Sequence, residues 1–396
     1  MLSLCADSRE ASPTDGHSAA AQGHASLVIE AWRGLAAWLV VYTHFWAFSG
    51  ADWAPLRLAH TGVNLFFVVS GFVFAPYLFG RALAWKAHAV RRFFRIYPAY
   101  LLALGVYIAM KATAGQPLLY VAEHLTFLHV QSKDMAFYYN APFWSLPAEV
   151  EFYLSLPLLA GVARLTDRWR GPRARDALLL GLLLGAGGLR WALGWASDTQ
   201  AQNAAFIALH HLPGVLVEFL LGAAAWRVST HSLSPVGRSS MVLAGVAGWA
   251  TLAVWFAQVG DAGLEASPAR GLIGAMSAVC FALMVAGTVR SAGPGTAATL
   301  LNSVAVPEGG QTGPWARQVR AGLMALALWA GHLSYGVYLF HMAALRAAEA
   351  WAPGWGLGGS RALAVVLTLA IATAVYLAWE NPWRLLGRRW AVRLTG

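Results

Sequence analysis

Apolar stretches of about 20 residues follow one another along most of the chain, separated by short polar segments. They are rich in Leu, Ala and Gly and lack the alternation of about ten residues that marks the strands of an outer-membrane barrel. Because a membrane span must satisfy its backbone hydrogen bonds internally, the stretches predict helices. The expected spans lie near residues 27–48, 58–79, 96–113, 144–163, 177–196, 207–226, 240–258, 269–289, 321–342 and 361–380. The pattern therefore predicts an all-α, polytopic membrane bundle of about ten helices.

Composition and charge support this class and orient the bundle. Of the 396 residues, 58% are hydrophobic and 12% are charged. An ordinary soluble domain could not bury so much apolar surface. With a cytoplasmic N-terminus, 21 of the 28 Lys and Arg residues fall on the cytoplasmic side and 7 outside. This asymmetry follows the positive-inside rule and predicts both termini on the cytoplasmic side of an inner (plasma) membrane. The net charge of +10 then reflects topology and affinity for lipid headgroups or an anionic cofactor, so nucleic acid is not an expected partner.

The polar segments divide the chain into one membrane domain with two tails. Residues 1–24 are small and polar without the features of a signal peptide, and we expect a disordered cytoplasmic tail. The membrane domain spans 25–383 and includes a flexible inner loop at 291–319, which is rich in Gly, Pro, Ser and Thr. A short or re-entrant helix is expected at 121–130, and residues 384–396 form a basic cytoplasmic tail.

The first span carries two ionisable residues, Arg33 and His44, eleven positions apart. On a helix this spacing returns to within roughly 20° of the starting direction and separates the two residues by about 16 Å along the axis. Both side chains are therefore expected on one face. Ionisable groups at membrane depth are candidates for a functional site.

A second polar group lies at the outer end of the fourth span. Ser145 and Glu149 are four residues apart and share a helical face, while Glu151 points about 200° away from Glu149. A carboxylate at this position is suited to orienting an imidazole or balancing an arginine. The alternative is an interfacial glutamate that faces water.

Three further polar residues lie within apolar spans and are candidates for contact with a substrate. Asn64 and Ser70 lie in the second span, where Ser70 next to Gly71 also fits helix packing. His341 ends the ninth span, seven residues after Ser334, and the alternative for it is a structural histidine.

A basic cluster follows the second span. Arg92 and Arg95 are neighbours on a helix, and Arg91 flanks them at the membrane surface. The guanidinium fork matches phosphate oxygens, so the cluster is a candidate site for the phosphates of an anionic cofactor; the alternative is a topology anchor. Cys5 and Cys280 lie far apart, and no pattern of His, Cys and carboxylates with metal-ligand spacing is visible, so no metal is expected.

Taken together, six motifs resemble those of the membrane acyltransferase family 3, whose members O-acylate surface sugars, exopolysaccharides and some secondary metabolites. The motifs are Arg33-x10-His44, GVNLFFVVSGF at 62–72, RRFFRIYPAY at 91–100, FWSLPAEVEFYL at 143–154, SYGVYLFH at 334–341 and Glu380-Asn381-Pro382. The resemblance implies that His44 and Arg33 are essential and that Glu149 takes part in function. It also implies that Arg92 and Arg95 handle acyl-CoA. Where the family often has consecutive acidic residues, this chain has Glu149, Val150 and Glu151, which argues against a role for Glu151.

The residues themselves suit this chemistry. Acyl transfer from a thioester to a hydroxyl needs a base, and a neutral imidazole fits that task, so His44 is the expected base. Glu149, if adjacent, would fix the tautomer of the ring, and Arg33 would stabilise the oxyanion or grip a phosphate of CoA. We expect acetyl-CoA as the donor, a carbohydrate or glycosylated acceptor and membrane lipids as partners. Direct transfer and an acyl-histidine intermediate both stay open.

Two other classes of protein fit ten spans with buried charges. A transporter or flippase of a sugar-lipid or small molecule would move its substrate without consuming CoA. A membrane scaffold would tolerate alanine at Arg33 and His44 apart from effects on stability.

Overall fold

The computed structural model describes residues 13–46, 54–171, 173–198, 202–265, 271–289 and 314–394. Within these ranges the chain forms helices joined by turns and loops, with no strand. The predicted all-α class is confirmed.

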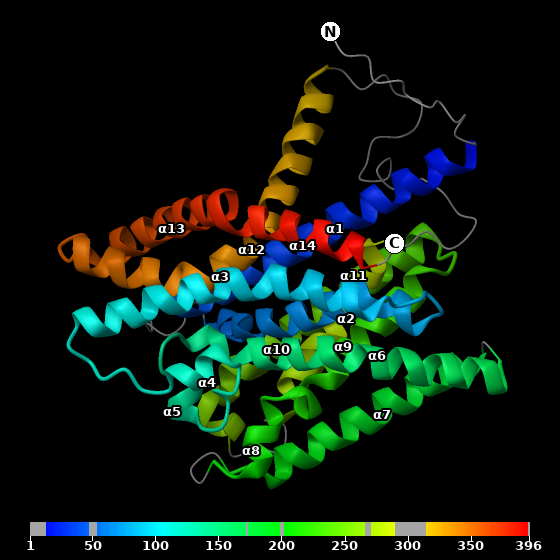
Figure 1. Ribbon diagram of the computed structural model, residues 1–396, viewed down its shortest axis with the longest axis horizontal. Coiled ribbons are helices and arrows are strands. Elements are labelled where there is room, and N and C mark those ends of the chain that lie inside the picture. Colours follow the sequence, from blue (N-terminus) through cyan, green and yellow to red (C-terminus); the bar gives the residue numbers. More distant parts are fainter. Residues whose placement is uncertain are drawn as a thin grey trace.

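The helices of the first half lie largely side by side (Figure 1). They are α1 (Pro13–Phe45), the 3-10 helix η2 (Ala54–Thr61), α2 (Gly62–Leu78), α3 (Trp85–Thr113), α4 (Val121–Leu125), α5 (Lys133–Ala136), the 3-10 helix η3 (Ala141–Trp144) and α6 (Ser145–Arg170). The short α4 confirms the helix expected at 121–130.

The second half supplies the remaining helices, and the first part of α12 projects from the bundle (Figure 1). They are α7 (Arg173–Ala196), α8 (Ala204–Leu209), α9 (Leu212–Ser229), α10 (Pro235–Glu265), α11 (Ile273–Thr288), α12 (Pro314–Trp351), α13 (Gly356–Val375), the π-helical turn η5 (Tyr376–Glu380) and α14 (Asn381–Arg393).

The helices that suit a bilayer match most of the predicted spans. Eight stretches of helix in the described chain are long and apolar enough to cross a membrane, and they coincide with eight of the ten predicted spans. The other two are helical but fall short. With 16 residues, α11 is too short, while α1 carries Glu30, Arg33 and His44, which lower its mean hydropathy. The protein is a multi-pass helical membrane protein, and the count of ten and the side of the termini stay predictions.

Several helices extend beyond the boundaries expected from the sequence. Helix α1 begins at Pro13, within the segment 1–24 expected to be disordered, where an alanine-rich run favours helix; residues 1–12 lie outside the described chain. Helix α14 likewise covers most of the expected basic tail. Of the expected inner loop, residues 291–313 lie outside the described chain, and α12 starts directly after them.

Close helix contacts fix the centre of the bundle. Helix α2 packs on α9 through Gly71 and Gly222. A Cβ atom at Gly71 would lie 1.8 Å from the carbonyl oxygen of Phe219, and one at Gly222 would lie 2.0 Å from that of Val68. Only glycine permits such an approach, as is common where membrane helices cross.

Helices α1 and α12 pack against each other in the same direction. Glu30 lies against Gly331 near one end of the contact, and His44 lies against His341 farther along both helices. This arrangement places Glu30 and His44 of α1 toward α12.

Candidate functional site

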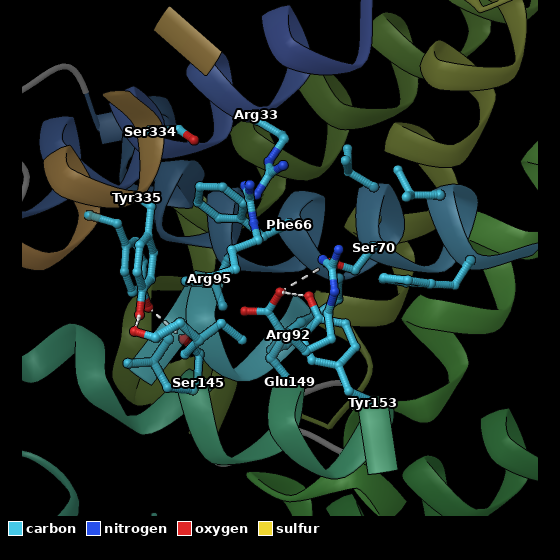
Figure 2. A pocket seen from close by; sticks show the side chains of 18 residues that line it. Arg33, Phe66, Ser70, Arg92, Arg95, Ser145, Glu149, Tyr153, Ser334 and Tyr335 are labelled. Carbon is cyan, nitrogen blue, oxygen red and sulfur yellow. Dashed lines mark hydrogen bonds between the residues drawn. The ribbon is translucent and has the colours of Figure 1, made fainter. Parts of the chain in front are cut away.

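A pocket lies between α1, α2, α3, α6 and α12 and is lined by 18 residues (Figure 2). Its empty volume, including its open mouth, is about 730 Å³. Six of the residues singled out from the sequence line it, namely Arg33, Ser70, Arg92, Arg95, Ser145 and Glu149. They come from four helices, so the fold brings together motifs that lie more than one hundred positions apart.

Arginine dominates the charge of this pocket. Arg33, Arg92 and Arg95 converge on it, and Glu149 is the only carboxylate among its described lining residues (Figure 2). Glu30 lies 3.8 Å from Arg33, outside the lining, and balances part of the charge. An excess of guanidinium groups in a partly enclosed space favours an anionic ligand with several oxygens.

Aromatic rings hold Arg92 in place. Its guanidinium carbon lies 5.0 Å from the centre of the Phe74 ring and 5.6 Å from that of Tyr153, which are cation–π distances. These contacts orient a long side chain that would otherwise sample many rotamers. Arg91, the third arginine of the cluster, is not among the described residues that line the pocket.

The Glu149 carboxylate is held by two hydroxyl groups of the pocket. Ser70 donates a hydrogen bond to Glu149 Oε1 at 3.3 Å, and the Tyr153 hydroxyl donates to the same oxygen (Figure 2). Ser70 thus has a polar partner inside the pocket, while the neighbouring Gly71 makes the packing contact with α9. The sequence predicts Glu149 as a partner of the His44 ring if the two are adjacent; the ring that lies against His44 is that of His341.

Beyond the pocket, His44 and His341 lie against each other. His44 Nδ1 is 3.3 Å from His341 Nε2, and the ring centres are 5.0 Å apart with a tilt of 54°. His341 is fully buried. Neither histidine is among the described residues that line the pocket. The sequence identified both residues but gave no sign that they meet, because each spacing describes positions on one helix only.

Tyr338 and Ser145 connect the pocket with the histidine pair. The Tyr338 hydroxyl donates to the carbonyl oxygen of Pro142 at 2.6 Å and lies 2.6 Å from Ser145 Oγ. Both side chains line the pocket, and the Tyr338 ring centre is 6.5 Å from that of His341. Tyr338 lies three residues before His341 in the SYGVYLFH motif, a spacing that places both on one helical face and is a signal in the sequence for this contact.

Asn64 belongs to a different polar cluster. It donates to Glu218 Oε1 at 2.7 Å, and Arg190 Nη1 lies 3.0 Å from the same oxygen. Glu218 is fully buried. The sequence analysis missed Glu218 and Arg190, although a single carboxylate in the apolar run LPGVLVEFLL is a recognisable signal at membrane depth.

Two other acidic residues support the helices around the pocket. Glu151 accepts from His211 Nδ1 at 2.5 Å and from the backbone amide of Leu212 at 2.7 Å, so it caps the start of α9. Glu380 of the Glu-Asn-Pro motif lies 3.7 Å from Arg384, and the neighbouring Trp379 donates to the Pro98 carbonyl at 2.9 Å, one turn from Arg95. Both therefore anchor helices from outside the described lining of the pocket.

Among the described residues, no group of three or more His, Cys, Asp or Glu side chains is arranged to hold a metal ion.

Comparison with known protein families gives a match over most of the chain. The family model described as an acyltransferase domain, that of acyltransferase family 3, matches residues 27–379. This range includes every lining residue of the pocket and both members of the histidine pair. No curated protein and no solved structure matches the chain.

Proposed function

The chain belongs to the membrane acyltransferase family 3, and on this premise we propose that it moves an acyl group from acyl-CoA to a hydroxyl group of a carbohydrate or glycosylated acceptor. The observation that carries the proposal is the convergence of Arg33, Arg92 and Arg95 on one pocket close to the pair of His44 and the buried His341. The reaction needs both features, because the donor carries phosphate groups and the acceptor must lose a proton.

The arginines fit the donor. CoA carries a diphosphate and a third phosphate, and arginine binds phosphate oxygens through two parallel hydrogen bonds. Arg33 lines the same pocket as Arg92 and Arg95, which favours contact with phosphate over its alternative role at the oxyanion. Arg91 lies outside the described lining of the pocket, and its proposed role is contact with lipid headgroups at the membrane surface. We take acetyl as the acyl group, since it is the commonest donor in the family.

His44 acts as the base in the proposed reaction. It accepts the proton of the acceptor hydroxyl as that oxygen bonds to the thioester carbonyl carbon. The carbon–sulfur bond then breaks, the electron pair leaves with sulfur, and the proton passes to the CoA thiolate. Ser145 and Tyr338 line the pocket, Tyr338 lies beside His341, and in the proposed reaction both contact the acyl end of the donor.

The membrane gives the reaction a direction. CoA esters are cytoplasmic, and the excess of basic residues in alternate loops supports a topology with both termini on the cytoplasmic side of the inner membrane. With that topology, Arg33 lies nearer the cytoplasm than His44, so the acyl group passes from an inner donor site toward an acceptor outside. Labelling an acceptor in sealed inside-out and right-side-out vesicles tests this. Acylation confined to the side that holds CoA would refute it.

Mass spectrometry of surface glycans or secreted glycosides tests the function itself. We expect acyl groups on the glycans of cells that express the wild-type protein and their loss with His44→Ala. His231→Ala, which changes an exposed histidine outside the pocket, is the matched control and should leave acylation intact. An unchanged acylation pattern with normally expressed His44→Ala protein would contradict the proposal. Movement of a sugar-lipid without CoA release would identify a transporter.

A further inference from the structure

The hydrogen-bond partners of the histidine pair determine where its protons lie. His44 Nδ1 is 2.9 Å from the carbonyl oxygen of Val40, and His341 Nδ1 is 3.0 Å from that of Val337. A carbonyl oxygen only accepts hydrogen bonds, so the Nδ1 atom of each neutral ring carries the hydrogen. The lone pair of each ring is therefore on Nε2.

This assignment makes the contact between the rings directional. His341 Nε2 has the lone pair and lies 3.3 Å from His44 Nδ1, which has the hydrogen. The Nδ1–H group of His44 is thus shared between the carbonyl oxygen of Val40 and His341 Nε2. His341 accepts, His44 donates, and Nε2 of His44 is the basic nitrogen.

The packing of α1 on α12 fixes this contact. A Cβ atom at Gly34 would lie 2.6 Å from Ala330 Cβ, and one at Gly331 would lie 2.3 Å from Glu30 Cβ. Such close approach leaves little freedom for the two helices to shift. The Phe45 ring, centred 6.1 Å from the ring of His341, adds to its enclosure.

We propose that His341 is a positioning residue that holds His44 in the tautomer with hydrogen on Nδ1 and directs its Nε2 atom toward the acceptor hydroxyl. The inference rests on the proposed function and adds a role that the family match does not assign. When His44 Nε2 takes the proton, the imidazolium Nδ1–H donates to the neutral His341, which shares the positive charge.

A neutral partner suits this position. In soluble hydrolases a buried carboxylate orients the histidine base. At membrane depth a carboxylate would pay a large desolvation penalty, whereas a neutral imidazole accepts the same hydrogen bond at smaller cost. Glu149 meanwhile accepts from Ser70 and Tyr153 inside the pocket.

The test compares the kinetics of purified variants in nanodiscs with acetyl-CoA and a glycan acceptor that carries free hydroxyl groups. His341→Leu removes the acceptor atom, whereas His341→Gln replaces it with an amide oxygen near the position of Nε2. We expect His341→Leu to lower kcat about 10- to 100-fold, as for other groups that orient a histidine, with KM for acetyl-CoA changed by less than about twofold. His341→Gln should recover about tenfold of that loss.

A control variant separates positioning from folding. His332→Leu removes another α12 histidine, which stacks on Tyr376 and is not among the described lining residues of the pocket. It should keep the wild-type kcat. Nitrogen-15 NMR of the His44 ring should show hydrogen on Nδ1 in the wild-type protein and a mixture of tautomers in His341→Leu. If the leucine variant loses activity because it is unstable, the spectrum still shows whether the tautomer of His44 has changed.

The outcomes distinguish this inference from the function on which it rests. Inactive His44→Gln together with fully active His341→Leu would overturn the positioning role and keep the acyltransferase. Equal losses in the leucine and glutamine variants, with an unchanged His44 tautomer, would also overturn it. Full activity of His44→Gln would instead refute the base assignment in the proposed function.

Discussion

The Tyr338 hydroxyl lies 2.6 Å from Ser145 Oγ, at the place where the arginine pocket meets the histidine pair. The tyrosine also donates to the carbonyl of Pro142, so two hydrogen bonds hold its ring at the boundary. The tyrosine lines the pocket, and its ring centre lies 6.5 Å from that of His341. In the proposed reaction, Tyr338 is therefore the side chain that the acyl group meets between the arginines and His44.

This position predicts that Tyr338 limits the length of the acyl group. Tyr338→Ala should raise kcat/KM for butyryl-CoA relative to acetyl-CoA about tenfold, because a removed ring makes room for extra methylene groups worth about 1 kcal/mol each. Tyr338→Phe keeps the ring and should leave the ratio close to the wild-type value. Competition assays with the two donors measure this ratio of kcat/KM values. An unchanged ratio in the alanine variant would show that Tyr338 does not limit the length of the acyl group.

The arginine cluster predicts different effects for neighbouring residues. Arg95→Gln should raise KM for acyl-CoA about 10- to 100-fold, since one charge-assisted hydrogen bond contributes about 1.5–3 kcal/mol. Arg91→Gln is the matched control, because Arg91 is close in sequence but outside the described lining of the pocket. Steady-state kinetics at fixed ionic strength compares them. Equal effects of both variants would mean that the cluster acts only through its general charge.

The buried cluster of Asn64, Arg190 and Glu218 predicts a large effect on stability. Glu218→Ala leaves Arg190 buried without its carboxylate and should cost about 3–5 kcal/mol. Asp176→Ala breaks a comparable ion pair with Arg227, but those side chains are 47% and 36% exposed, so its cost should stay below about 1 kcal/mol. Thermal unfolding in detergent compares the two variants. A smaller loss for Glu218→Ala than for Asp176→Ala would contradict the buried ion pair.

The segment around α4 predicts sensitivity to acid. His124 and His129 stack with ring centres 4.2 Å apart and are both fully buried. Burial, followed by the proximity of His124, lowers the pKa of His129 to about 4. An exposed histidine has a pKa near 6.5, so the opened segment binds protons more readily between these values. The closed state of the segment therefore keeps its full stability above about pH 6.5 and loses stability as the pH falls toward 4.

Hydrogen exchange measures this effect. We expect faster exchange of residues 121–140 at pH 5 than at pH 7.5, after correction for intrinsic rates, and little change in α14. His129→Gln should reduce the difference, since the amide side chain does not titrate. Equal protection of the segment at both pH values would show that protonation of the stacked histidines does not open it.

The sequence predicts many of the residues that line the pocket, because polar residues within apolar spans and the spacing of the motifs identify them. The helical spacings place Arg92 with Arg95 and Ser145 with Glu149, and the pocket contains all four. Helical periodicity cannot show which helices touch, so the contact between His44 and His341 and the pairing of Asn64 with Glu218 required the structure. Hydrophobic patterning also does not fix where a helix ends: α1 begins at Pro13, well before the predicted span at 27–48, because an alanine-rich run favours helix there.

The most direct measurement of the central claim uses purified protein in nanodiscs with acetyl-CoA and a glycan acceptor. The amounts of free CoA and of acylated acceptor are measured in the same reaction. The wild-type protein should release one CoA for each acceptor molecule acylated, and His44→Gln should do neither while still binding CoA through its intact arginine pocket. Stoichiometric transfer by His44→Gln at the wild-type rate would contradict the account.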